Sequence, residues 1–219
     1  MRVIILAAGQ GFQLDGFNTL LIKHPKTGQR IIEQYLEIFD YKQITVVVGY
    51  RAINIMHQYP KLHYVYSSKW SVTNNSYSLG SVLSDEPCFV VSSDLFMDKE
   101  IFTMLDEAEP NCVLTENSEE RVLASLNCSL EGRRIREIYQ GKVRSHEDPE
   151  SLGVHKITDR TLLRIWGKNC LRYTNLFNVQ NLPLNEEVPI YCVDIGRYNL
   201  DEINTQLDYI KLINKYSTE

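Results

Sequence analysis

The sequence predicts an α/β protein: a three-layer α/β/α sandwich with a mostly parallel central sheet and a small antiparallel lobe. Apolar, largely β-branched runs at 3–6, 44–48 and 88–91 are typical of strands that are buried on both faces of a sheet. Between the first two runs, residues 29–39 carry apolar side chains with the period of an amphipathic helix. A helix between two such strands implies a right-handed crossover and therefore parallel pairing.

Beyond residue 110 the pattern changes to shorter strands separated by turns, which predicts the antiparallel lobe at about 111–150 of a single domain spanning 1–219. We expect Asp98 to cap one helix and Thr158 another. The other strands that we expect lie at 62–66, 112–114, 122–127, 135–139, 152–157 and 190–193, and the other helices at 51–59, 98–105, 159–166, 175–181 and 200–216.

The composition is that of an ordinary globular protein, with 43% hydrophobic and 23% charged residues among 219. A net charge of −5 without a basic block argues against nucleic acid as the main partner. No apolar run approaches the length of a membrane span, and the chain begins with a strand rather than a signal peptide. We therefore expect a cytoplasmic protein without membrane or nucleic-acid partners, and the oligomeric state stays open.

The five cysteines and five histidines do not form a recognisable metal-binding pattern. The cysteines are odd in number, form no C-x-x-C pair and mostly lie in apolar runs, which indicates reduced, buried thiols. A zinc site or a catalytic cysteine is therefore not expected.

A glycine-containing loop, Ala7 to Leu14, follows the first strand directly. Small residues there let the backbone approach a ligand, and successive amide groups form a concavity that binds anions. Ligands of open α/β sheets bind at this carboxyl edge. The loop lacks the third glycine of a dinucleotide-binding motif and the Gly-Lys-Ser/Thr of a P-loop. On the glycines alone, an ordinary tight turn is an equally good interpretation.

The string Ile5-Leu6-Ala7-Ala8-Gly9-Gln10-Gly11 resembles the signature loop of the nucleotidyltransferase superfamily. The resemblance implies a Rossmann-like fold and transfer of a nucleoside monophosphate from an NTP to a phosphate, phosphonate or sugar phosphate. In that family an arginine and a lysine follow, where this chain has Gln13 and Thr19, so both usual cations are absent. Lys23 is our candidate for a catalytic cation in their place, with Arg2, Lys26 or an arginine of the lobe as alternatives. The nucleotide contacts that the resemblance implies are Leu6, Ala7, Ala8, Gly9, Gln10, Gly11, Gln13, Asn75 and Ser78.

The segment Thr73 to Gly80, with Asn74-Asn75 followed by Ser78-Leu79, favours a capped turn that leads into a helix. It also resembles an Asn-Asn-x-x-Ser-Leu segment of the cytidylyltransferases that activate phosphocholine and aminoethylphosphonate. That segment lies near the nucleotide in those enzymes. A plain helix cap is the alternative interpretation.

A candidate metal ligand, Asp94, follows the strand at 88–91 and therefore lies at the same sheet edge as the loop. Magnesium prefers one or two carboxylates together with substrate phosphates. Residues 201–209 resemble the family's Glu-Ile-Asp-Thr-x-x-Asp-Tyr, whose aspartate is a second metal ligand and corresponds to Asn204 here. We expect Asp94, Glu202 and Asn204 to hold Mg²⁺, with Asp94 also catalytic and Asp194 as a further possible contributor.

The resemblance implies a cytidylyltransferase that uses CTP and Mg²⁺ and releases pyrophosphate. Its acceptor is expected to be 2-aminoethylphosphonate, 2-hydroxyethylphosphonate or phosphocholine. Two alternatives remain: a sugar-1-phosphate nucleotidyltransferase, and a catalytically silent nucleotide-binding variant, which the absence of the two cations favours. One or two basic residues of the lobe are candidates to grip an anionic acceptor, and four aromatic residues are candidates for a cage around a quaternary amine. These residues are Arg133, Arg134, Arg136, Lys142 and Arg144, and Trp70, Trp166, Tyr139 and Tyr173.

Overall fold

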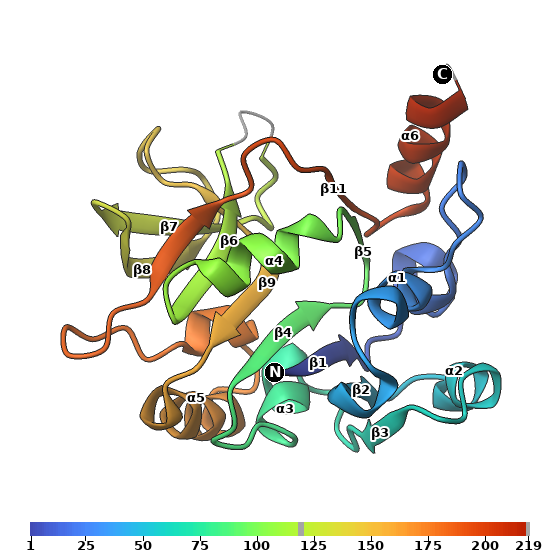
Figure 1. Cartoon of the computed structure of the whole chain (residues 1–219), viewed down its shortest axis with the longest axis horizontal. Coiled ribbons are helices and arrows are strands. Elements are labelled where there is room, and N and C mark those ends of the chain that lie inside the picture. The colour runs from blue at the N-terminus through green and yellow to red at the C-terminus, as the bar shows by residue number, and fades with distance from the viewer. Residues whose placement is uncertain (118–120, 218–219) are drawn as a thin grey trace.

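The computed structural model describes residues 1–117 and 121–217. Its centre is a nine-stranded mixed sheet of order β3-β2-β1-β4-β9-β6-β10-β8-β7, with helices on both faces (Figure 1). The strands are β1 (Arg2–Ala7), β2 (Ile44–Val48), β3 (His63–Tyr66), β4 (Cys88–Ser92), β5 (Leu95–Met97), β6 (Asn111–Glu116), β7 (Leu126–Glu131), β8 (Arg134–Gln140), β9 (Glu150–Ile157), β10 (Tyr191–Asp194) and β11 (Leu200–Glu202).

The α-helices are α1 (Ile31–Ile38), α2 (Ala52–Gln58), α3 (Asn75–Gly80), α4 (Glu100–Glu107), α5 (Arg160–Arg172) and α6 (Gln206–Ser217). Short 3₁₀ turns are η1 (Phe12–Leu14), η2 (Thr19–Leu21), η3 (Tyr41–Gln43) and η4 (Asn178–Asn181). The elements expected in the first half of the chain are therefore present, within a few residues of their predicted bounds.

Strand β1 shows how the sheet divides two hydrophobic cores. Its side chains alternate between faces, so Val3 and Ile5 pack with α1, α2 and α4, whereas Ile4 and Leu6 pack with α3 and α5. All four are buried, which explains why the strand reads as a continuous apolar run. The strand pairs in parallel with both β2 and β4.

The expected parallel pairing holds in the block β3-β2-β1-β4 and between β6 and β10. Strand β9 is antiparallel to both β4 and β6, and β7 and β8 form an antiparallel hairpin. Because β9 also pairs with β7, the strands β6, β9, β7, β8 and β10 close into a ring. The sheet is therefore mixed, since strands that are joined by a short hairpin must run against each other.

The predicted lobe is only partly separate from this sheet. The hairpin of β7 and β8 turns at Glu131-Gly132 as expected, but β7 begins at Leu126 rather than at 122. The strand expected at 112–114 is β6, which pairs in parallel with β10 in the main sheet.

Two predicted helix caps are wrong. Asp159, not Thr158, caps α5 by accepting a hydrogen bond from the backbone N of Leu162 at 2.8 Å. Asp98 does not cap α4, because its carboxylate accepts the backbone N–H of Asn199 at 2.9 Å instead.

The closing helix expected at 200–216 is divided in two. Its first three residues form β11, which pairs with β5 beside the sheet, and α6 begins at Gln206. The helix expected at 175–181 is only the 3₁₀ turn η4.

Within the part of the chain that the structure describes, no helix combines the length and the apolar character that crossing a membrane requires. The five cysteines are buried and free, as the sequence predicted. Burial raises the pKa of the Cys88 thiol to about 12, so this group stays protonated and unreactive at neutral pH.

Candidate functional site

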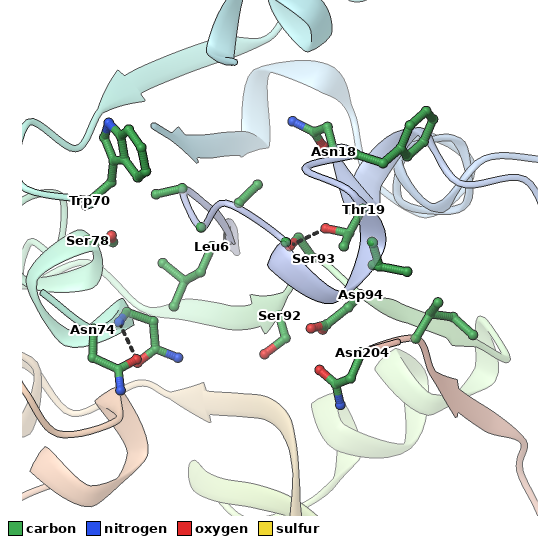
Figure 2. Close-up of a pocket in the computed structure, with 18 of the residues that line it drawn as sticks. Leu6, Asn18, Thr19, Trp70, Asn74, Ser78, Ser92, Ser93, Asp94 and Asn204 are labelled. Carbon is green, nitrogen blue, oxygen red and sulfur yellow. Dashed lines mark hydrogen bonds between the residues drawn. The ribbon is translucent and has the colours of Figure 1, made fainter. Parts of the chain in front are cut away.

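A cavity of about 260 Å³ opens at the carboxyl ends of β1 and β4 (Figure 2). The glycine loop, the segment before α3, the residues after β4 and the residues after β11 all contribute to it. Its lining residues are Leu6, Ala7, Ala8, Gly9, Gly11, Leu14, Phe17, Asn18, Thr19, Trp70, Thr73, Asn74, Asn75, Ser78, Ser92, Ser93, Asp94, Ile203 and Asn204.

The loop after β1 folds back on itself at Gly11, which has φ of 58°. The carbonyl of Gly11 accepts backbone N–H groups from Leu14 at 2.8 Å and from Gly16 at 3.0 Å. A side chain at Gly11 would be strained in this left-handed conformation and would lie 3.0 Å from the carbonyl oxygen of Phe17. The loop thus brings backbone, rather than side chains, to the cavity wall.

Gly49 follows β2 directly, and its lack of a side chain lets Trp70 pack next to the loop after β1. A Cβ atom there would lie 2.5 Å from the carbonyl oxygen of Ala8 and 2.7 Å from Trp70. The Trp70 ring packs on Tyr50 with their centroids 5.3 Å apart. Trp70 therefore lies against the backbone of the sheet edge, where it lines the cavity.

The segment before α3 is held by hydrogen bonds to a distant part of the chain. Asn75 accepts the backbone N–H of Asn178 through Oδ1 at 2.8 Å, and the backbone N of Asn74 donates to Thr174 at 2.8 Å. Asn181 donates from Nδ2 to the Ser76 hydroxyl at 2.7 Å. The Asn-Asn segment is thus a capped helix start, as expected, that is also fixed by residues around η4.

Asp94 follows β4 and projects toward the cavity, next to Asn204 (Figure 2). Its Oδ1 atom is buried and has no hydrogen-bond partner among the described residues. Burial raises the pKa of Asp94 to about 6, because a carboxylate loses its hydration there. The backbone N of Ile203 donates to the Asp94 carbonyl at 2.8 Å, which brings the end of β11 to this site.

Glu202 lies on β11, close enough to Asp94 for the two carboxyl groups to interact electrostatically. Much of its surface is exposed, yet surrounding protein atoms and then the charge of Asp94 raise its pKa to about 7. Two carboxyl groups this close, one of which raises the pKa of the other, provide the negative potential that a divalent cation neutralises.

Magnesium fits these residues. Within the described residues no group of three or more histidine, cysteine, aspartate or glutamate side chains is placed to hold a metal ion. Mg²⁺ does not need such a cage, because one or two carboxylates with substrate phosphates and water complete its octahedron. The orphaned oxygen of Asp94 and the amide of Asn204 are suitable donors.

The lining residues include no lysine or arginine within the part of the chain that the structure describes. The Thr19 hydroxyl lies 2.8 Å from the Ser93 hydroxyl, directly before Asp94 (Figure 2). Lys23 is exposed and outside the lining, and its carbonyl accepts the Tyr209 hydroxyl at 2.8 Å. The cavity therefore offers amides, hydroxyls and a carboxylate to a ligand.

Most of the predicted nucleotide and metal residues gather around this cavity. Nine line it: Leu6, Ala7, Ala8, Gly9, Gly11, Asn75, Ser78, Asp94 and Asn204. Four do not line it: Gln10, Gln13, Lys23 and Glu202. The roles proposed for all of these residues stay predictions.

Sequence reasoning passed over several lining residues, and did not connect Asn178 to the site. Ser92 and Ser93 could have been predicted, because they directly precede Asp94 in the sequence. Thr73 and Asn74 lie in the segment that was singled out, but only Asn75 and Ser78 were named as contacts. The contact of Asn178 with Asn75 spans 103 residues and leaves no local pattern.

The arginines of the lobe that are paired do not reach the cavity, because acids on the surface hold them. Arg133 pairs with Glu109 at 2.8 Å, and Arg144 pairs with Glu137 at 2.8 Å. Arg136 pairs with Glu131 and Glu186.

Of the four aromatic cage candidates, Trp70 alone lines the cavity. Trp166 is wholly buried, and its indole donates to the Asn178 carbonyl at 2.7 Å, so it belongs to the core.

No protein-family model matches the sequence, and no curated protein matches it significantly. Solved structures do resemble the chain over almost its whole length. The CTP:phosphocholine cytidylyltransferase of Streptococcus pneumoniae has a TM-score of 0.78 and 20% identity, covering 98% of both chains. The inositol-1-phosphate CTP transferase of T. maritima has a TM-score of 0.74 and 15% identity, covering 98% of this chain and 95% of that one.

A putative glucose-1-phosphate thymidylyltransferase of Bacillus anthracis also resembles the chain, with a TM-score of 0.70 and 14% identity over 98% of this chain and 94% of that one. The three structures share one α/β architecture and differ in the nucleotide and acceptor that their names give. At these identities the likeness concerns the fold.

Proposed function

Starting from a nucleotidyltransferase fold, we propose that the chain transfers a cytidylyl group from CTP to a small phosphonate or phosphate acceptor and releases pyrophosphate. The acceptors that we propose are 2-aminoethylphosphonate, 2-hydroxyethylphosphonate and phosphocholine. The observation that carries the proposal is the joining of the glycine loop, the Asn-Asn segment and Asp94 around one cavity. The likeness to a CTP:phosphocholine cytidylyltransferase over 98% of both chains supports it.

The reaction needs no nucleophile from the protein. An oxygen of the acceptor anion attacks the α-phosphorus of CTP, a new P–O bond forms, and the bond between the α-phosphorus and the bridging oxygen breaks. Pyrophosphate leaves with the electron pair of that bond. The acceptor oxygen already carries negative charge near neutral pH, so the protein has to position the two reactants and neutralise charge.

The residues of the cavity divide this work. Backbone amides of the loop from Gly9 to Gly11 face the triphosphate, and the Thr19 and Ser93 hydroxyls offer further hydrogen bonds. Asp94, with Asn204 and Glu202, would hold Mg²⁺. When bound, this ion supplies the positive charge that stabilises the developing negative charge at the α-phosphate.

A second candidate function is nucleotide binding without turnover. The observation that favours it is the absence of lysine and arginine from the lining of the cavity within the described residues. One preorganised donor to a transition state is worth about 3 kcal/mol, so losing two cations can reduce turnover severely. The Thr19 hydroxyl provides a hydrogen bond at that position but no charge.

The test is a measurement of pyrophosphate release in the presence of Mg²⁺. CTP, UTP and ATP are each combined with phosphocholine, 2-aminoethylphosphonate, 2-hydroxyethylphosphonate and glucose-1-phosphate. Release with CTP and one of the first three acceptors is the expected result. Release only with glucose-1-phosphate would replace the proposal by a sugar-1-phosphate nucleotidyltransferase.

Calorimetry with CTP and Mg²⁺ separates the second candidate from the first. Binding of CTP without pyrophosphate release from any pair would support the silent nucleotide-binding protein. Neither binding nor release would contradict both functions.

A further inference from the structure

We propose that Asn75 selects cytosine over uracil because the fold leaves only its hydrogen-bond donors to face the nucleobase. This inference rests on the proposed function, since it requires that the cavity bind a pyrimidine nucleotide. It assigns the choice of base to one side-chain amide and to the distant backbone group that fixes its orientation.

The orientation of the Asn75 amide follows from its partner. A backbone N–H can only donate, so the atom that accepts from the Asn178 N–H at 2.8 Å must be the carbonyl oxygen Oδ1. The amide nitrogen Nδ2 is then the remaining polar atom of the side chain. It has no hydrogen-bond partner within the described residues and is not buried, and Asn75 lines the cavity. The N–H donors are therefore the groups of the Asn75 side chain that have no partner in the fold and are left for a ligand.

The backbone group of Asn178 is itself fixed. The indole of the fully buried Trp166 donates to the Asn178 carbonyl at 2.7 Å. Asn181 binds the Ser76 hydroxyl next to Asn75 in the chain, also at 2.7 Å. Rotation of the Asn75 amide would place N–H against N–H at Asn178 and lose a part-buried hydrogen bond, so the locked orientation persists when the ligand binds.

The Asn75 end of the cavity is the end for the base. Asp94 and Asn204 lie at the opposite end, where the metal ion and the reacting α-phosphate belong (Figure 2). Asn74 and Trp70 lie on the far side, with the loop after β1 between the two ends. A nucleotide whose phosphates follow the loop therefore places its base near Asn75 and the Trp70 ring.

The two pyrimidines differ in what they offer to a donor. Cytosine presents two neighbouring acceptors, O2 and N3, whereas uracil presents O2 beside an N3–H donor. A locked N–H facing N3 makes a hydrogen bond with cytosine and faces another N–H with uracil. One well-placed contact of this kind discriminates between bases by about 10-fold to 100-fold. The Trp70 face can stack on either base, so the amide provides the discrimination.

The first experiment measures the dissociation constants of CTP and UTP with Mg²⁺ by calorimetry. The unmodified chain is expected to bind CTP about 10-fold to 100-fold more tightly than UTP. Asn75→Asp keeps the shape and still accepts from Asn178, but replaces the donor with an acceptor. We expect this variant to lose its preference for CTP or to reverse it. The added negative charge affects both nucleotides alike and cancels in the ratio.

A second pair of variants tests the lock without changing Asn75. Asn178 is the first residue of η4, where proline is well tolerated, and Phe177 before it is already extended, with ψ of 149°. Asn178→Pro removes the N–H that fixes the amide, so we expect the ratio of UTP to CTP dissociation constants to fall toward 1. Asn178→Ala is the matched control, because it keeps the N–H and removes a side chain whose Nδ2 has no partner among the described residues. This control should keep the ratio.

Equal affinity of the unmodified chain for CTP and UTP would overturn the inference, as would an unchanged ratio in Asn178→Pro. Either result would leave the proposed transfer reaction standing if pyrophosphate release is found. Selective binding of CTP without release would support the inference and contradict the transfer reaction. If neither nucleotide binds, both proposals fail.

Discussion

The two ends of the cavity are built in opposite ways. At the Asn75 end, the carbonyl oxygens of Asn74 and Asn75 accept backbone N–H groups, and the Ser78 hydroxyl lies 3.0 Å from that of Ser67. At the Asp94 end, a buried carboxylate oxygen has no partner within the described residues, and a second carboxyl group adds negative charge. At the first end the side-chain oxygens are already paired within the protein, whereas at the second end the carboxylates need a cation to neutralise their charge.

This difference separates stability from function. Paired polar groups cost little when buried and hold a fixed shape, which suits recognition of a base. A buried carboxylate without a partner lowers the free energy of unfolding. Binding of a ligand that neutralises its charge restores that stability. Mutations at the two ends should therefore have opposite effects on the empty protein.

The largest effect is expected for Asp94→Asn. Loss of the charge that holds Mg²⁺ should lower turnover by about 10³-fold, which is about 4 kcal/mol. The same change removes a buried ionised group, so the free energy of unfolding without Mg²⁺ at pH 7.5 should rise by about 2 kcal/mol. Pyrophosphate release and urea unfolding measure the two effects.

Asp98→Asn is the matched control, because Asp98 lies outside the lining of this cavity and binds Asn199. It should leave turnover unchanged. A loss of stability in Asp94→Asn would show that this carboxylate is a structural group rather than a site that awaits a cation.

The next effect contrasts two glycines near the loop. Gly49→Ala forces a Cβ against the Ala8 carbonyl and Trp70, and backbone cannot yield cheaply, so we expect a loss of about 2–3 kcal/mol in the free energy of unfolding. Gly9→Ala meets nothing within 4 Å and should fold as well as the unmodified chain. It should nevertheless weaken CTP binding, because the methyl group enters the cavity. Equal stability of the two variants would contradict this account.

The third effect concerns pH, where the Asp94 end and a buried histidine have opposite signs. Burial lowers the pKa of His155 to about 4, so its stabilising contribution is complete above its unfolded pKa of 6.5 and is lost as the pH falls toward 4. Asp94, with its pKa raised to about 6, contributes most below 3.8 and loses that contribution as the pH rises through 6.

Replacing His155 should therefore remove one of these two pH dependences of the free energy of unfolding. Relative to His155→Gln, the unmodified chain should lose about 2 kcal/mol of unfolding free energy between pH 7 and pH 4.5. Urea unfolding at several pH values measures the difference. His57→Gln, a change at an exposed histidine of α2, keeps His155 and is the matched control, whose pH profile should run parallel to that of the unmodified chain. Parallel pH profiles for His155→Gln and the unmodified chain would refute the assignment.

The smallest effect is expected for Thr19→Lys. This change adds a cation beside Ser93 and Asp94 and should raise turnover with CTP by about 10-fold, less than a fully preorganised donor would give. It should also raise the stability of the metal-free protein, because the ammonium pairs with the carboxylate. Thr19→Met, of similar length but neutral, is the control. No gain over Thr19→Met would show that the missing lysine does not limit the reaction.

Much of the first half of the fold could be predicted from the sequence, because its strands are buried on both faces and need little context. The run at 44–48 became β2 with the expected bounds. The start of the closing helix could not be predicted, because the apolar residues before Gln206 continue the helical spacing of the apolar residues in α6. Ile203 is buried beside Asp94, whereas Leu207 on α6 is 59% exposed. The local sequence favours a helix at Leu200–Glu202, but these residues form a strand because they pair with β5, which is distant in the sequence.

The site could be predicted where chemistry follows a strand directly, as at Gly9, Gly11 and Asp94. It could not be predicted where one segment fixes another across the fold. The bond from Asn178 to Asn75 joins residues 103 apart, and neither local sequence marks the contact.

The return of the chain to β5 has a consequence for biosynthesis. During translation, the loop after β1 and Asp94 are made early, but Ile203 and Asn204 reach them only after some two hundred residues have been joined. Asn178 arrives late as well. A nascent chain can therefore form the parallel block of the sheet long before it can bind its ligand, and Asp94 stays without its neighbours Ile203 and Asn204 until synthesis is nearly finished.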